Sequence, residues 1–88
     1  MAIFVVENTF DQPLTDELHD ASGKRLDSCL EAHGAKWLRS YLSSDRLRMV
    51  CHFEAPDAEA VRASYRTAQV KFEKIWVATL YTRQGVER

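Results

Sequence analysis

The sequence predicts an α+β fold in which two helices cover one face of a four-stranded antiparallel sheet. Three observations support this prediction: four short runs rich in β-branched and aromatic residues, two longer runs with apolar residues at helical spacing, and the order of these runs along the chain. The expected strands are 2–10, 35–43, 46–54 and 73–82, and the expected helices are 14–33 and 57–69.

The first strand and the first helix have clear signals. The run AIFVVENTF, residues 2–10, is short, β-branched and aromatic. Residues 14–33 carry apolar or small residues at helical spacing, with Thr15 as the expected N-cap and Gly34 as the expected stop. Gly23 inside this helix costs roughly 1 kcal/mol relative to alanine, and nothing in the sequence accounts for it.

The middle of the chain predicts a hairpin followed by the second helix. The two alternating runs AKWLRSYLS and RLRMVCHFE are joined around Ser44-Asp45, which is typical of a β-hairpin. Asp57 follows a proline and is the expected N-cap of the second helix.

The chain ends on a fourth strand, 73–82, and residues 83–88 are expected to form a loose tail. All 88 residues therefore belong to one expected domain. The order strand–helix–strand–strand–helix–strand is the split βαβ arrangement of ferredoxin-like domains. In that arrangement both helices pack on one face of the sheet, and the other face stays open.

Composition excludes several classes of partner. The formal net charge is -1 with acidic and basic residues mixed along the chain, so neither nucleic acid nor an anionic membrane is an expected partner. The apolar run at residues 2–6 is too short for a signal peptide or a membrane span, and we expect a cytoplasmic location. Cys29 and Cys51 form no local redox or zinc motif and are expected to be small buried residues.

Side-chain alternation sorts the two central strands into two faces, provided that the hairpin loop holds an even number of residues. The apolar set, expected beneath the helices, is Leu38, Ser40, Leu42, Leu47, Met49, Cys51 and Phe53. The set expected on the open face is Trp37, Arg39, Tyr41, Arg48, Val50, His52 and Glu54.

The first and last strands are apolar on both sides, and a sheet of that kind is covered on both faces. A second copy, packed sheet against sheet as in dimeric α+β barrels, is the simplest cover, so we expect a homodimer. Trp37, Arg39, Tyr41 and His52 would then line a cleft suited to a small-molecule ligand. The same residue types are also enriched in interfaces that bind no ligand, and both interpretations stay open.

Two further functions are open, an enzyme that uses the same cleft and a metal-binding protein. In an enzyme of the cofactor-independent isomerase or monooxygenase type, His52 or Glu7 would act as a general base. In a metal-binding protein, the ligands would be Glu7, His52 and Tyr65, although no local metal motif supports such a site. The sequence does not determine which face of the sheet Glu7 occupies.

The segments WLRSYLSSD, RMVCHFEAPDAEAVRASYRTA and KIWVA resemble a small family of domains of unknown function that includes nickel-responsive proteins. The resemblance runs from the first strand to the last, and its most specific part is the block Cys51–Asp57. It implies a ferredoxin-like domain that pairs as a dimer, and nickel binding in some members. Those members carry histidines at the end of the first strand, where this chain has Glu7-Asn8-Thr9, and at the position of Tyr65. Carboxylate, amide and phenol groups suit nickel less well, so the nickel site is not expected here.

Overall fold

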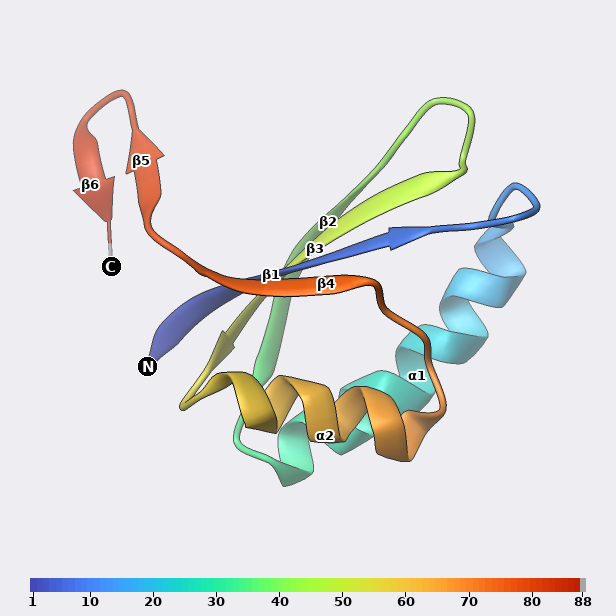
Figure 1. Ribbon diagram of the computed structural model, residues 1–88, viewed down its shortest axis with the longest axis horizontal. Helices are drawn as coiled ribbons and strands as arrows, with labels where there is room; N and C mark the ends of the chain where they lie inside the picture. The colour runs from blue at the N-terminus through green and yellow to red at the C-terminus, as the bar shows by residue number, and fades with distance from the viewer. Residues whose placement is uncertain (88) are drawn as a thin grey trace.

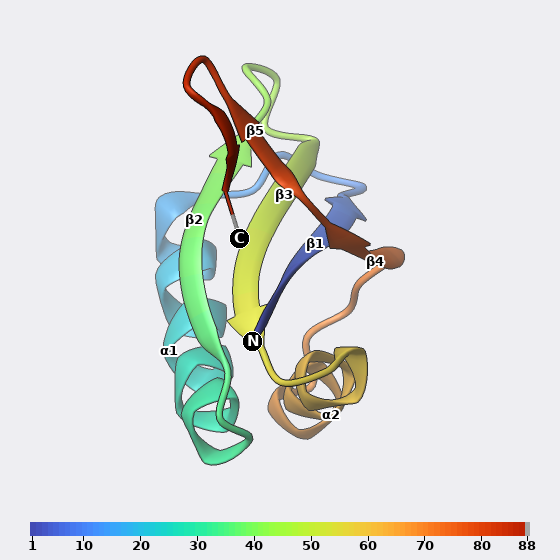
Figure 2. The same ribbon diagram turned by 90° about the vertical axis from the view of Figure 1, so that its left-hand side faces the viewer.

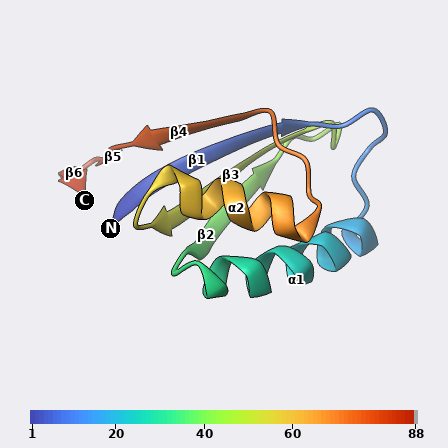
Figure 3. The ribbon, with the colours of Figure 1, turned by 60° about the horizontal axis from the view of Figure 1, so that its bottom comes forward.

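Four antiparallel strands form the main sheet, in the order β2-β3-β1-β4. The structure is a computed structural model that describes residues 1–87. The strands of this sheet are β1 (Ala2–Thr9), β2 (Lys36–Leu42), β3 (Arg48–Ala55) and β4 (Lys74–Ala78). Two helices, α1 (Asp16–Ala32) and α2 (Ala58–Ala68), lie on one face of the sheet, as Figures 1 and 3 show. The predicted ferredoxin-like α+β fold is confirmed.

The ends of the helices follow the capping residues. The Thr15 side chain accepts a hydrogen bond from the Leu18 N–H at 3.1 Å, which starts α1 as predicted. Gly34, at φ 73°, follows the end of α1, and the Ala35 N–H donates to the Leu30 carbonyl at 2.8 Å. This pattern is a Schellman motif, which favours glycine because of the left-handed backbone. Asp57 caps α2 by accepting from the Ala60 N–H at 2.8 Å.

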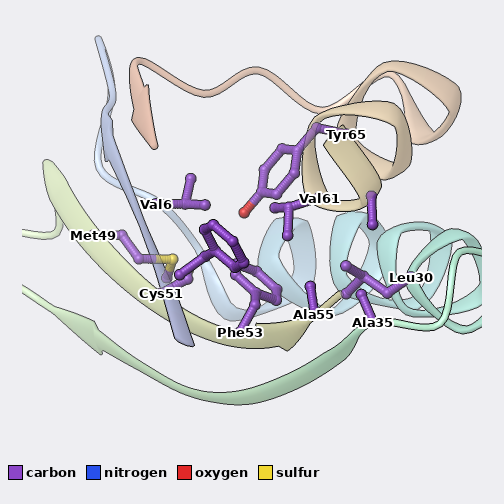
Figure 4. Packing of buried hydrophobic residues seen from close by; sticks show 11 residues of the cluster. Val6, Leu30, Ala35, Met49, Cys51, Phe53, Ala55, Val61 and Tyr65 are labelled. Carbon is purple, nitrogen blue, oxygen red and sulfur yellow. The ribbon is translucent and has the colours of Figure 1, made fainter. Parts of the chain in front are cut away.

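The core lies between the helices and the sheet. Its fully buried members include Val6 and Phe53 from the sheet, Leu30 from α1, and Val61 and Tyr65 from α2. Figure 4 shows the Tyr65 ring directed from α2 toward the sheet, with Phe53 nearby. The two rings meet edge to face, with their centroids 5.9 Å apart, which is a favourable aromatic geometry.

The end of the chain differs from the prediction. The expected strand 73–82 is interrupted after Ala78, and the expected loose tail contains a strand. β5 (Leu80–Thr82) and β6 (Gly85–Glu87) pair with each other as a separate two-stranded sheet. Figures 1 and 2 show this hairpin beyond the end of β4, away from both helices. The left-handed backbone at Gly85, with φ 127°, is readily adopted by glycine, and it lies where β6 begins opposite Thr82. Arg88 lies outside the described residues.

Candidate binding site on the open sheet face

Two rows of residues cross the face of the sheet that the helices leave bare, which we call the open face. In the first row, Arg39 pairs with His52, His52 with Val5, and Val5 with Trp76. Each row crosses all four strands, because residues that are directly opposite in adjacent strands point to the same side.

The second row lies one pleat away. Tyr41 pairs with Val50, Val50 with Glu7, and Glu7 with Lys74. These pairs place Glu7 on the open face, which the sequence could not decide. The register also confirms that Arg39, Tyr41 and His52 share this face, as alternation predicts.

Two contacts join the rows. The Tyr41 and His52 rings meet edge to face, with centroids 5.7 Å apart and an interplanar angle of 64°. At the other side of the face, the Trp76 Nε1–H donates to Glu7 Oε2 at 2.7 Å. The charged acceptor makes this a strong type of hydrogen bond, and it fixes the carboxylate against the indole.

The centre of the open face is apolar, and its margins are aromatic or ionisable. Val5 is only 4% exposed, whereas Tyr41 is 59% and Trp76 48% exposed. The surface therefore offers an apolar floor, two aromatic walls, an imidazole, a carboxylate and the Arg39 guanidinium. Such a surface can hold a small molecule that is partly apolar and carries an acidic or carbonyl group.

The prediction that Trp37 lies on the open face is wrong. A β-bulge falls between Trp37 and Arg39, so that Trp37 pairs with Phe53 and Arg39 with His52. The bulge takes up one extra residue, Leu38, and reverses the facing of the residues before it. Trp37 therefore lies on the helix side, where its ring meets that of His19 on α1 with centroids 6.3 Å apart.

The predicted metal ligands Glu7, His52 and Tyr65 do not come together. Glu7 and His52 lie on the open face, while Tyr65 is 2% exposed in the core on the other side of the sheet. Burial raises the pKa of the Tyr65 phenol far above its usual range, which disfavours the phenolate that a metal would require.

Sequence analysis missed Trp76 and Val5 as open-face residues. Both belong to strands that are apolar on each side, so alternation alone could not assign their faces. Only the register of β1 against β3 and β4 determines them. Trp76 pairs with Val5, which lies two positions before Glu7 in β1 and therefore on the same face. Knowledge of this pairing would have placed Trp76 beside Glu7.

Residues 4–77 match the family described as nickel responsive protein SCO4226-like. The chain belongs to this family. The resemblance noted from the sequence is thereby confirmed. The chain is also similar in structure to SCO4226 from Streptomyces coelicolor A3(2), whose crystal structure superposes with a TM-score of 0.82 at 17% identity. The match covers 92% of this chain and 100% of that chain. At this identity the likeness shows a shared fold.

No curated protein sequence matches the chain significantly. Within the described residues, no helix is long and apolar enough to cross a membrane.

The side chains of this single chain do not fit a nickel centre. Among residues 1–87, no three His, Cys, Asp or Glu side chains converge in a way that could hold a metal ion. His52 is the one imidazole in the two rows, and the Glu7 carboxylate is already bound to Trp76. Nickel favours several nitrogen donors, so this donor set suits it poorly.

Proposed function

We propose that this SCO4226-like protein is a homodimeric binding protein, in which two open faces enclose a cleft for a small, partly apolar ligand. The observation that carries the proposal is the pair of rows across the open face, where aromatic and ionisable side chains surround an apolar floor. A face of that composition on a chain of 88 residues is unusual unless it binds something.

A second copy is the cover that we favour. A chain of this length buries a smaller share of its surface than a larger domain does, and a twofold pair of identical faces covers each with the other. The β5–β6 hairpin supports this arrangement, because it extends beyond the sheet and exposes Tyr81 (75%) and Val86 (49%). An exposed apolar hairpin of this kind is suited to packing on a partner subunit.

Each polar group of the open face has a role in the proposed cleft. Arg39 binds an acidic or carbonyl group of the ligand, since its guanidinium can donate two parallel hydrogen bonds. Tyr41 and Trp76 form the aromatic walls. His52 supplies an imidazole, which can donate or accept a hydrogen bond.

A catalytic use of the same cleft is the second candidate. Glu7 pairs with Val50, two residues from His52, so the carboxylate and the imidazole are diagonal neighbours on adjacent strands. A general base and a second ionisable group at that separation could act on one substrate. Loss of a pH-dependent activity in His52→Ala would support this candidate.

Native mass spectrometry of untagged protein, purified without chelator, tests the proposal. We expect a dimer that retains an additional organic mass. An additional mass of one metal ion would instead favour metal binding by residues of two protomers. A monomer at micromolar concentration would contradict the proposal.

Two matched variants test which face forms the dimer. Tyr41→Glu places a charge on the open face, and Val77→Glu places one on β4 beside Phe4, on the helix side of the sheet. Both parent side chains are well exposed in one protomer, at 59% and 65%, so neither substitution removes a core contact. We expect Tyr41→Glu alone to give monomers.

A second pair of variants tests the ligand. Arg39→Ala should release the retained organic mass, whereas Arg62→Ala, an exposed arginine on α2, should leave it bound. Equal retention in both variants would remove Arg39 from the site.

A further inference from the structure

A second space lies on the other side of the sheet, between α1 and the rest of the core. It has a volume of about 1170 Å³. Its walls come from three elements: α1 contributes Gly23 and Leu26, the sheet contributes Trp37 and Cys51, and α2 with the segment after it contributes Tyr65 and Phe72. We call this space the interior cavity. Ligand pockets in proteins usually measure about 300–1,000 Å³, so the interior cavity is large enough for a small molecule.

At position 23, α1 presents no side chain to the interior cavity. His19, Gly23, Leu26 and Leu30 recur at spacings of four, three and four residues, which places them along one side of the helix. Of these, Leu30 alone is fully buried. A Cβ atom built on Gly23 would meet nothing within 4 Å.

Two unfavourable features therefore coincide at one helical turn. Glycine inside a helix costs roughly 1 kcal/mol relative to alanine, and protein interiors ordinarily leave few voids larger than a water molecule. A larger apolar residue at position 23 would remove the first and lessen the second. A glycine at position 23 is explained if the interior cavity binds a ligand.

The walls combine apolar surface with neutral hydrogen-bonding groups. Leu26, Met49 and Phe72 supply apolar contacts. On the sheet side, the Ser40 hydroxyl accepts from the Trp37 Nε1–H and donates to Cys51 Sγ, each at 2.9 Å. The charged residues that border the space are exposed to solvent. One of them, Arg25, donates from Nε to the Ala68 carbonyl at 3.2 Å and links α1 to α2.

Two groups of the inner walls, the Cys51 thiol and the Tyr65 phenol, stay neutral at neutral pH. Burial raises the pKa of the Cys51 thiol, and burial likewise raises that of the Tyr65 phenol. A charged group placed deep in the interior cavity would find no opposite charge among these residues, and it would lose its hydration.

We propose that the interior cavity is a binding site for a neutral, largely apolar small molecule that carries one hydrogen-bonding group. Its apolar part would lie against Leu26, Met49 and Phe72, and its polar group would meet the Trp37–Ser40–Cys51 chain. This site lies across the sheet from the open face and is independent of the function proposed above.

The test uses N-phenyl-1-naphthylamine, a neutral apolar fluorophore with one N–H group, as the probe. The parent protein should bind it with increased fluorescence. Gly23→Leu, which places an apolar side chain in the interior cavity, should weaken binding by at least about tenfold, since part of the space and of the apolar contacts of the probe is then lost. Gly23→Ala brings a similar gain in helix propensity without filling the space and should bind as the parent does. Ser28→Leu, on the exposed side of α1, is the control for added apolar surface.

The two tryptophans report where the probe binds. Trp37 borders the interior cavity and Trp76 lies on the open face. In ¹⁵N spectra, with the two indole signals assigned from Trp76→Phe, the probe should shift the Trp37 signal and leave the Trp76 signal in place. Should Gly23→Leu fail to fold, Gly23→Met repeats the test with a more flexible side chain. Three results would each overturn the proposal: no probe binding, a shift of the Trp76 indole signal alone, or unchanged binding by Gly23→Leu.

Discussion

Trp37 donates its indole N–H to the Ser40 hydroxyl at 2.9 Å, although residues three positions apart in a regular strand point to opposite faces of a sheet. The β-bulge at Leu38 makes this bond possible, because it turns Trp37 to the helix side, where Ser40 already points. Ser40 in turn donates to the buried Cys51 sulfur. The bulge thus connects the start of β2 to the core.

Ser40→Ala should break this connection. Removing the hydroxyl leaves the Trp37 N–H without its acceptor, and we expect a loss of about 1 kcal/mol in the free energy of unfolding. The Trp37 indole signal in a ¹⁵N spectrum should move at the same time. Ser44→Ala, in the exposed loop between β2 and β3, is the control. An unmoved indole signal in Ser40→Ala would contradict the bond.

Most of the fold could be predicted because its signals are local. Thr15 and Asp57 cap the two helices as their sequence context indicates. A turn centred on Ser44-Asp45 would pair Leu42 with Leu47, but Leu42 pairs with Met49, so the register is shifted by two residues. A shift of two preserves the facing of every residue after the bulge, so Arg39 and Tyr41 fall where alternation places them.

The site was predictable only in part, because a single inserted residue changes the facing of its neighbours. No turn residue or glycine marks the bulge at Leu38, so the displacement of Trp37 has no local signal. The face of Glu7 depends on the register between β1 and β3, which are far apart in the sequence. In the sequence, the glycine at position 23 was the one indication of the interior cavity. It could not be interpreted without the residues that pack against α1.

Two glycines should respond in opposite directions to alanine. Gly23→Ala should raise the free energy of unfolding by up to about 1 kcal/mol, because the helix gains propensity and the added methyl meets open space. Gly34→Ala should lower it by about 1 kcal/mol, because residue 34 has a left-handed backbone at φ 73°. Urea denaturation measures both values. A stabilising Gly34→Ala would be inconsistent with the Schellman motif at the end of α1.

Two substitutions of Glu7 test whether its side chain accepts the hydrogen bond from the Trp76 indole. Glu7→Gln keeps an oxygen that can accept from the Trp76 indole, whereas Glu7→Ala removes it. The Trp76 indole signal should therefore move further in Glu7→Ala than in Glu7→Gln. The Trp37 signal, on the opposite face, serves as the internal control. Equal spectra for the two variants would mean that Glu7 does not bind the indole in solution.

The free energy of unfolding should fall at alkaline pH because of two buried groups, the Cys51 thiol and the Tyr65 phenol. Burial raises the pKa of Cys51 above its ordinary value of 9.0 and that of Tyr65 above its ordinary value of 10.0. Above these values the unfolded chain releases protons that the folded chain keeps, so rising pH favours unfolding. The stability from these two groups is fully present below the unfolded-state pKa of each and is lost as the pH rises toward the folded-state one.

Tyr65→Phe isolates the contribution of the phenol. As the pH rises above the ordinary tyrosine value of about 10, the fall caused by the retained proton approaches roughly 1.4 kcal/mol per pH unit. The slope of the free energy of unfolding against pH should therefore be smaller in Tyr65→Phe than in the parent. Tyr81→Phe makes the same chemical change at a side chain that is 75% exposed, and its slope should equal that of the parent. If Tyr65→Phe and Tyr81→Phe gave the same slope, the Tyr65 hydroxyl would have to be open to solvent, and the packing of α2 on the sheet would differ from the one described here.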